Sequence, residues 1–230
     1  MIKKVVGVIT KTIIETLANV EIYGREHIPA SGGYVLASNH LGRIDPALLF
    51  YAFNRDDFII PVAEKYEHHP LFGPIGRSLG AIWLDRFNPD IRSLREMMQR
   101  MKRGDVLVIA PEGTRSKTEA LQEGRPGVVF LASRAGVPII PVAVYGTEDR
   151  VIKDNIKHFR RSRIVGRAGP PFMLTPVKGG QDREKVMREQ TDELMCRIAS
   201  LLPEKYHGVY AGHPRLKELM EEDHNKKSPG

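Results

Sequence analysis

The sequence predicts an α/β domain with a mostly parallel central sheet and helices on both faces. The first observation is alternation, because apolar β-rich runs and segments with helical periodicity follow one another along most of the chain. The second is that runs such as residues 106–110 are apolar throughout, as strands covered on both faces are. The third is size, since 230 residues with 41% hydrophobic content suffice for one domain with a sizeable core. The strand order does not follow from this pattern.

The first 18 residues are predicted to form an amphipathic helix. Its apolar face carries Ile2, Val5, Val6, Ile9, Ile13 and Leu17, and the opposite face carries Lys4, Lys11 and Glu15. Such a helix can lie in the headgroup plane of a membrane or dock on the protein's own core. The pattern alone leaves both readings open.

The next elements have recognisable start signals. Asp45 followed by Pro46 is typical of a helix N-terminus, with the aspartate as cap and proline at the first helical position. The expected elements are a strand at 34–38, a helix at 45–53, a strand at 58–63, a short helix at 70–79 and a strand at 81–84.

Similar signals divide the second half of the chain. Asn88 and Pro89 open a helix that ends near Gly104, and Gly136 closes a later one. The expected elements are a helix at 88–104, a strand at 106–110, a helix at 126–135, a strand at 137–145, one or two strands within 163–174 and a long amphipathic helix at 182–202. Residues 221–230 are expected to be a fraying polar tail.

The charge of the chain suits anionic partners. Lys and Arg exceed Asp and Glu by seven, and residues 150–167 hold seven of the basic residues against Asp154 alone. Phosphate groups, anionic lipid, acidic carrier proteins or nucleic acid would fit, although a solvated basic loop is an equal alternative. Nucleic acid is disfavoured, because the stretch lacks interleaved aromatic residues and a helix-turn-helix pattern.

Other compositional features narrow the class of protein. The single Cys196 excludes an intramolecular disulfide framework and a cysteine-rich metal site, and fits a reducing compartment. No apolar run reaches the length of a transmembrane helix, and the first residues do not resemble a signal peptide.

The first chemical feature is His40, at the end of a predicted strand, five residues before Asp45. A carboxylate that accepts from Nδ1–H fixes the imidazole tautomer and leaves Nε2 free to take a proton from a substrate hydroxyl. This is two-thirds of the serine hydrolase arrangement, with the substrate's hydroxyl in place of serine. Taken alone, the pair is more often a helix cap and an ordinary turn residue.

Three further segments offer weaker signals. Residues 111–116 follow a strand and bring backbone N–H groups, a hydroxyl and the Arg115 guanidinium together, as a phosphate cradle would. Glu112 there would repel phosphate unless it is paired with Arg or directed at a hydroxyl. Residues 80–86 form a short apolar strand ending in Arg86, which can share a phosphate with Arg115. Residues 136–144 can be core strand or the wall of an acyl-chain channel.

The four segments in this order resemble the glycerophospholipid acyltransferases, specifically the 1-acyl-sn-glycerol-3-phosphate acyltransferases (PlsC-like). Residues 39–46, 80–86, 111–116 and 137–141 resemble the family's four blocks, over about residues 20–145. The resemblance implies a glycerol-3-phosphate acyltransferase-like fold and a catalytic dyad of His40 and Asp45. It also implies acceptor binding by Arg86, Glu112, Gly113, Thr114 and Arg115, and an acyl-donor region around Ile140 and Pro141. Lys65 is a further candidate phosphate contact.

The predicted protein therefore has a membrane-associating helix at 1–20, an acyltransferase domain at 21–205 and a tail at 206–230. It is expected to transfer an acyl group from acyl-CoA or acyl carrier protein to lysophosphatidic acid, at the cytoplasmic face of the cell membrane, without a metal or cofactor. Two alternatives stay open. One is an acyltransferase for another lysophospholipid or for glycerol 3-phosphate. The other is a non-catalytic protein that binds anionic lipid through its N-terminal helix and basic stretch.

Overall fold

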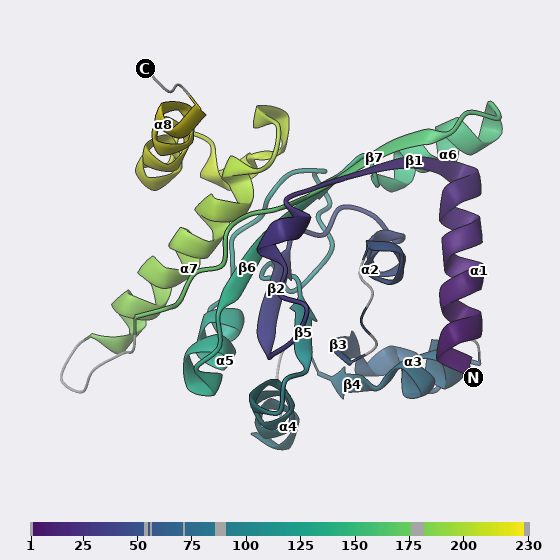
Figure 1. The fold of residues 1–230 in the computed structure, drawn as a ribbon, viewed down its shortest axis with the longest axis horizontal. Coiled ribbons are helices and arrows are strands. Elements are labelled where there is room, and N and C mark those ends of the chain that lie inside the picture. The colour runs from purple at the N-terminus through teal and green to yellow at the C-terminus, as the bar shows by residue number, and fades with distance from the viewer. Residues whose placement is uncertain are drawn as a thin grey trace.

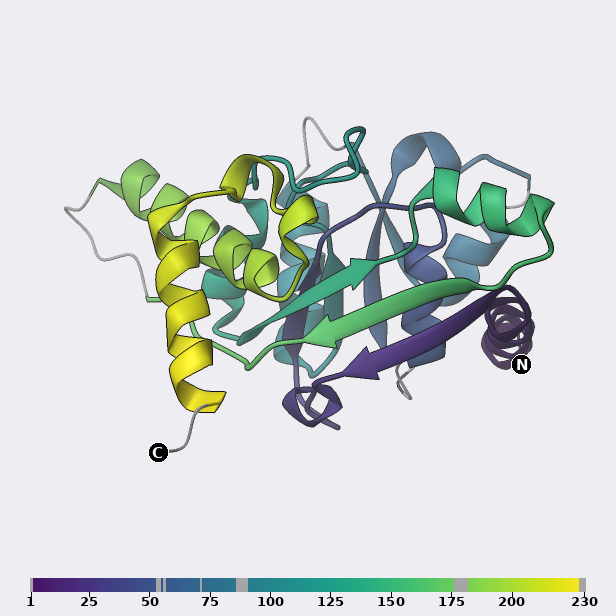
Figure 2. The same cartoon turned by 90° about the horizontal axis from the view of Figure 1, so that it is seen from above.

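The computed structural model describes residues 2–52, 55, 57–70, 72–85, 91–175 and 182–227 (Figures 1 and 2). Its helices are α1 (Ile2–Leu17), α2 (Asp45–Ala52), α3 (Phe72–Leu79), α4 (Ile91–Lys102), α5 (Gly127–Ala135), α6 (Asp149–Lys157), α7 (Arg183–Ser200) and α8 (Pro214–Lys227). Four 3₁₀ turns are η1 (Arg25–His27), η2 (Glu64–Tyr66), η3 (Glu204–Tyr206) and η4 (Gly208–Tyr210).

The strands of the described chain form one seven-stranded, mostly parallel sheet in the order β1-β7-β6-β2-β5-β3-β4. They are β1 (Ala18–Tyr23), β2 (Tyr34–Ser38), β3 (Phe58–Ala63), β4 (Ala81–Leu84), β5 (Val106–Ile109), β6 (Ile139–Tyr145) and β7 (Ser162–Ala168). The pair β6–β7 is antiparallel, and the other five pairs are parallel. The predicted fold class is confirmed.

Alternation along β2 divides the core into two sides. Val35 and Ala37 join the larger cluster beneath α4, α5 and α7, whereas Tyr34 and Leu36 join a smaller cluster on the opposite face. Helices α1 and α2 cover the second face farther along the sheet, where Ile14 is buried. Helices α1 and α8 lie at opposite ends of the molecule (Figures 1 and 2).

The expected element boundaries agree with the observed ones to within a few residues. Strand 81–84 matches β4, and the helix expected at 182–202 is α7, which Asp182 caps by accepting from the backbone N–H of Lys185. Asn88 and Pro89, the predicted start of α4, lie outside the described residues.

Several elements were not predicted. Strand β1 follows α1 without an intervening turn, so no punctuation marks the change of period. Helix α6 occupies part of the stretch interpreted as a basic loop. It was missed because few of its residues are apolar, so its helical periodicity is weak. The region expected as a tail at 206–230 contains η4 and α8, and α8 packs on α7 through the buried Leu216.

Candidate active site

The candidate site lies where the central strands β6, β2 and β5 end. These three strands are adjacent and parallel, so their carboxyl ends meet at one edge of the sheet. His40 follows β2, Glu112 follows β5 and Asp149 follows β6. Open α/β sheets place ligand sites at this edge.

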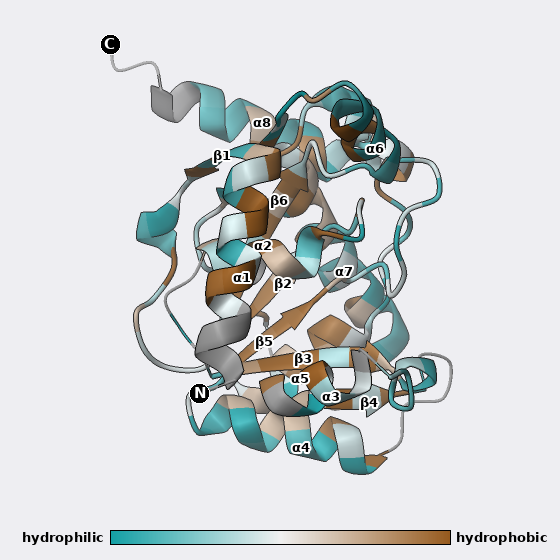
Figure 3. Cartoon of the chain, turned by 90° about the vertical axis from the view of Figure 1, so that its right-hand side faces the viewer, coloured by the Kyte–Doolittle hydropathy of each residue, from teal (hydrophilic) through white to brown (hydrophobic). Residues whose placement is uncertain are grey.

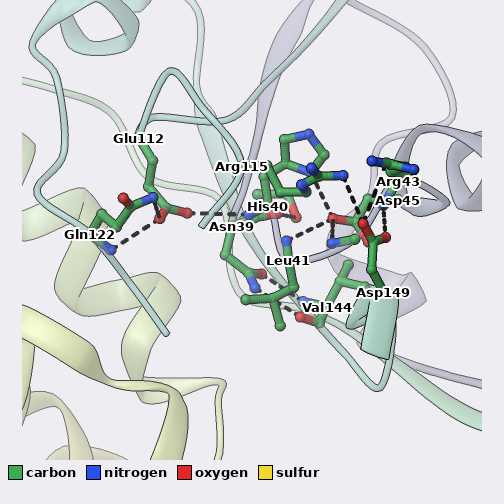
Figure 4. Close-up of polar contacts among 12 residues, drawn as sticks. Asn39, His40, Leu41, Arg43, Asp45, Glu112, Arg115, Gln122, Val144 and Asp149 are labelled. Carbon is green, nitrogen blue, oxygen red and sulfur yellow. Dashed lines mark hydrogen bonds and ion pairs between the residues drawn. The ribbon is translucent and has the colours of Figure 1, made fainter. Parts of the chain in front are cut away.

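His40 and Asp45 meet as predicted (Figure 4). His40 Nδ1 lies 2.8 Å from Asp45 Oδ2, and the same oxygen accepts from the backbone N–H groups of Leu41 at 2.8 Å and Gly42 at 3.0 Å. Donation from Nδ1–H leaves Nε2 as the free proton acceptor. Asp45 Oδ1 is buried and has no hydrogen-bond partner among the described residues. The pair therefore has the geometry of a general base and its orienting carboxylate.

The segment after β5 fixes the backbone of His40 from two sides. The His40 N–H donates to Glu112 Oε1 at 3.2 Å, and the His40 carbonyl accepts from Ser116 N at 2.8 Å. Glu112 Oε2 accepts from the backbone N–H of Gln122 at 3.0 Å and from its side-chain amide at 3.3 Å. The Glu112 carboxylate thus points at the protein's own N–H groups, an arrangement that the sequence reasoning did not consider.

Glu112 is only 2% exposed, and burial raises the pKa of its carboxyl above the ordinary value. The hydrogen bonds from Gln122 and from the His40 N–H offset part of this shift in pKa. The structure places Glu112 as a brace beneath His40. Its predicted contact with the acceptor stays a prediction.

The loop that carries His40 is also fitted against the end of β6. The buried Asn39 side chain makes two 2.8 Å hydrogen bonds, one from Nδ2 to the Val144 carbonyl and one from Val144 N to Oδ1. A Cβ at Gly42 would lie 1.7 Å from the Thr147 carbonyl oxygen, so no side chain fits there. Residues 39–42 therefore have little freedom.

The Arg115 guanidinium is paired with a carboxylate of the protein itself. Its Nη1 donates to Asp149 Oδ2 at 3.0 Å, and Asp149 also accepts from the backbone N–H of Arg43 at 3.0 Å (Figure 4). The Arg43 side chain contributes a second ion pair, with 3.4 Å between Nε and Asp149 Oδ2. Asp149, the first residue of α6, thus holds two guanidinium groups beside the dyad.

An open cavity of about 780 Å³ borders this ion pair. Its lining includes Leu41, the neighbour of His40, and Thr114 and Arg115 of the predicted phosphate cradle. Its volume falls within the usual range for small-molecule sites. Helix α6 forms the opposite wall, so part of the predicted acceptor site does face a pocket.

The remaining candidate residues are dispersed. Lys65 lies in η2, with Nζ 5.1 Å from the centre of the Tyr66 ring, and does not line the cavity. Gly113 has the positive φ of 70° that glycine tolerates in its turn. Ile140 and Pro141 are buried in β6, and Arg86 lies outside the described residues. The predicted roles of these residues stay predictions.

Asp149 and the α6 lysines that line the cavity were missed. Asp149 comes four residues after the end of β6, and only the strand order, which the sequence pattern does not provide, places it beside the end of β2. Within the described chain, no three His, Cys, Asp or Glu side chains gather as a metal-binding group.

Comparison with known proteins gives one consistent result. The family model described as "Acyltransferase" matches residues 19–145. The Bacillus subtilis 1-acyl-sn-glycerol-3-phosphate acyltransferase is 25% identical over 156 residues, which cover 68% of this chain and 76% of that protein. A coconut (Cocos nucifera) enzyme of the same name is 32% identical over 171 residues, 72% of this chain and 53% of its own length. This chain therefore spans about half of the coconut protein.

A solved structure agrees with the fold. The crystal structure of the 1-acyl-sn-glycerophosphate acyltransferase PlsC from Thermotoga maritima is similar with a TM-score of 0.62 and 24% sequence identity. The match covers 84% of this chain and 76% of that one. The α/β sheet and its flanking helices are thus shared with a protein of known structure.

Proposed function

This chain belongs to the acyltransferase family, and we propose that it transfers a fatty acyl group from a thioester donor to the free hydroxyl of 1-acylglycerol 3-phosphate, forming phosphatidic acid. The observation that carries the proposal is the 2.8 Å contact between His40 Nδ1 and Asp45 Oδ2, beside a cavity bordered by Arg115. The names of the relatives support the choice of acceptor.

The reaction follows from the orientation of the dyad. His40 Nε2 takes the proton of the acceptor hydroxyl while its oxygen attacks the thioester carbonyl carbon. Asp45 holds the tautomer and stabilises the imidazolium that forms. The tetrahedral oxyanion then collapses, the C–S bond breaks, and the proton on His40 passes to the departing thiolate. The products are the ester and the free thiol.

The chain's only thiol is unsuited to a covalent intermediate. Cys196 lies in α7 and is fully buried, with Sγ 3.4 Å from His213 Nδ1. Burial raises the pKa of this thiol to about 12, and a thiol with so high a pKa is a poor nucleophile near neutral pH. Direct transfer to the acceptor hydroxyl is therefore the mechanism we propose.

We test the dyad with thiol release from acyl-CoA, using a panel of lysophospholipids and glycerol 3-phosphate as acceptors. Loss of a positioned general base should lower the turnover of His40→Ala by roughly a hundredfold or more. His224→Ala is the matched control, because His224 is exposed on α8, at the far end of the molecule from α1. Near-normal turnover by His40→Ala would exclude the assignment, and the panel decides between lysophosphatidate and a sister acceptor.

Arg115 is proposed to bind the acceptor's phosphate. The phosphate must compete with Asp149 for the guanidinium, and a bidentate arginine–phosphate contact supplies the geometry for that exchange. Arg115→Ala should then raise KM for lysophosphatidate while sparing a phosphate-free acceptor such as a monoacylglycerol. Equal impairment with both acceptors would remove the anchor from the proposal.

We propose that α1 lies at a membrane surface. Ile9 and Ile13, which the sequence placed on the apolar face, are 53% and 52% exposed, whereas Ile14 is buried against the domain. Figure 3 looks onto this helix, whose ribbon mixes hydrophobic and hydrophilic residues. The side chains of Ile2, Val5 and Val6 are outside the described part. No described helix combines the length and apolar character needed to cross a bilayer.

A further exposed apolar residue, near the C-terminal end of α1, supports this proposal. Phe159 is fully exposed at the turn between α6 and β7, and the nearby Arg161 donates to the Glu15 and Ala18 carbonyls at the end of α1. Aromatic side chains with neighbouring cations suit the headgroup region of an anionic bilayer.

Sedimentation with anionic vesicles tests the membrane proposal. Ile9→Ser combined with Ile13→Ser should reduce vesicle binding, whereas Val209→Ser, a similarly exposed apolar site in η4, should not. Unchanged binding of the double variant would reject α1 as the contact. The non-catalytic alternative predicts vesicle binding without thiol release by the wild-type protein.

A further inference from the structure

The wall of the cavity opposite Arg115 carries positive charge that the acceptor does not need. Five basic side chains line the cavity: Arg115, Lys117, Arg150, Lys153 and Lys157. Three acidic ones, Glu119, Asp149 and Asp154, also line it. The distribution of ion pairs decides which of these charges are available to a ligand.

Each acidic side chain is already paired with an arginine. Asp149 binds Arg115, Glu119 Oε2 accepts from Arg150 Nη2 at 3.1 Å, and Asp154 Oδ2 accepts from Arg160 Nη2 at 2.7 Å. In the part of the chain that the structure describes, Lys117, Lys153 and Lys157 have no ion pair. Three uncompensated ammonium groups therefore face one cavity.

The other basic residues of the 150–167 stretch have separate roles. Arg161 holds the end of α1, Arg163 Nε lies 2.7 Å from Glu21 Oε1, and Arg167 stacks 5.4 Å from the centre of the Tyr23 ring. The excess charge of this stretch is thus not spread over a loop. On the described chain, Lys153 and Lys157 are its two members left without a partner, and both line the cavity.

These two lysines lie farther along α6 than Asp149, the residue that pairs with Arg115. In 1-acylglycerol 3-phosphate the free hydroxyl and the phosphate are on neighbouring carbons, so a hydroxyl that touches His40 keeps the phosphate beside the dyad. Lys153 and Lys157 follow Asp149 by four and eight residues, which is about 6 Å and 12 Å of helix rise. Their ligand needs anionic groups at a distance from its reacting atom.

We propose that Lys117, Lys153 and Lys157 bind the phosphates of the nucleotide end of acyl-CoA, so that this cavity holds that end of the donor as well as the acceptor's phosphate at Arg115. In acyl-CoA the pantetheine arm separates the thioester from the diphosphate and the 3′-phosphate. The cavity extends from Leu41, beside His40, to Lys157, so it can hold the thioester at the dyad and the phosphates along α6. Lysine ammonium groups suit such phosphates as mobile point charges. This inference rests on the proposed function and names its donor.

The test compares donors that lack some or all of the phosphates of acyl-CoA, and variants that lack two of the lysines. Wild-type protein is assayed by thiol release with acyl-CoA, acyl-dephospho-CoA and acyl-pantetheine, at a fixed lysophosphatidate concentration. The same donors are given to Lys153→Ala combined with Lys157→Ala, and to Lys217→Ala, a control at an exposed site on α8. Calorimetry with adenosine 3′,5′-bisphosphate measures binding without turnover.

We expect the double variant to raise KM for acyl-CoA about tenfold, a change worth about 1.4 kcal/mol, with kcat and acceptor KM unchanged. It should also lose the wild-type preference for acyl-CoA over acyl-pantetheine and bind the bisphosphate more weakly, while Lys217→Ala behaves as wild type. An unchanged donor KM would overturn the inference, as would a rise in acceptor KM alone.

Failure of the inference and failure of the proposed function can be told apart. If no acceptor supports thiol release, the proposed function fails, yet the calorimetry still reports whether the lysines bind the bisphosphate. If wild-type protein uses only acyl carrier protein and does not bind the bisphosphate, the transfer reaction stands and the nucleotide site is rejected.

Discussion

Glu112 is buried directly beneath the backbone of His40, and its ionisation has a consequence for stability. Burial raises the pKa of this carboxyl in the folded protein, so the folded state binds a proton more readily than the unfolded chain does. Its contribution to stability is present at low pH and is lost as pH rises above the ordinary carboxyl pKa.

Glu112→Gln removes this titration. Because only the wild-type protein must ionise the buried group, the Tm of the variant minus that of the wild type should increase between about pH 4 and about pH 7. Thermal unfolding across this range gives the difference directly. Glu189→Gln, on the exposed surface of α7, is the control and should show a nearly constant difference. A constant or falling difference for Glu112→Gln would show that burial does not control this carboxyl.

Two roles of Glu112, support of the His40 backbone and contact with the acceptor, predict different changes in kinetics. A brace acts through the position of His40, so Glu112→Gln should lower kcat and leave KM for lysophosphatidate nearly unchanged. A side chain that touched the acceptor would raise KM instead. Thiol-release kinetics at several acceptor concentrations separate these outcomes.

At the scale of elements, the site depends on a close contact between two loops. The loop after β2 passes so near the segment after β6 that Gly42 faces the Thr147 carbonyl without room for a methyl group. Gly42→Ala must push the loops apart, at a cost of about 1–3 kcal/mol of unfolding free energy. The variant should also lose turnover, because the Gly42 N–H is one of the three donors that hold Asp45.

Gly127→Ala is the matched control for that prediction. Gly127 opens α5, and a Cβ there meets nothing within 4 Å. Alanine favours the helix over glycine by about 0.5–1 kcal/mol, so the control should keep or slightly gain stability. Urea unfolding and thiol release measure both variants. Equal losses in the two would mean that the loop contact at Gly42 is not specific.

The sequence was most informative where elements have their own punctuation. Asp45 with Pro46 marked α2 and its place beside His40, and Gly136 marked the end of α5. It could not predict that Asp149 would compensate Arg115, because that contact joins residues 34 positions apart through a strand order that periodicity does not encode. The role of Glu112 was missed for a related reason, since its partners include the backbone N–H of His40, 72 residues away.

Across the whole molecule, the C-terminal region secures both loops of the site. Leu121, in the long loop after β5, donates its N–H to the Tyr206 carbonyl at 2.9 Å and accepts from Val209 N at 3.2 Å. The Tyr206 hydroxyl reaches the other loop and donates to Glu148 Oε1 at 2.5 Å. The region predicted as a tail therefore links the segment after β5 to the segment after β6.

Loss of the Tyr206 hydroxyl should therefore affect both the stability of the fold and the active site. Glu148 is buried, its Oε2 has no partner among the described residues, and it precedes Asp149, the partner of Arg115. Tyr206→Phe leaves that carboxylate without its donor and should cost about 1–3 kcal/mol of unfolding free energy. Turnover should fall as well, because a shift at Glu148 displaces the start of α6.

Tyr23→Phe provides the comparison, since the Tyr23 hydroxyl makes a similar hydrogen bond to Glu21 on an exposed surface of β1. Water replaces that hydrogen bond easily. The free energy of unfolding, measured in urea, should therefore change by only about a few tenths of a kcal/mol, as is usual for surface substitutions. If Tyr206→Phe were as mild as Tyr23→Phe in both unfolding and turnover, the C-terminal region would be a covering of the core rather than a support for the site.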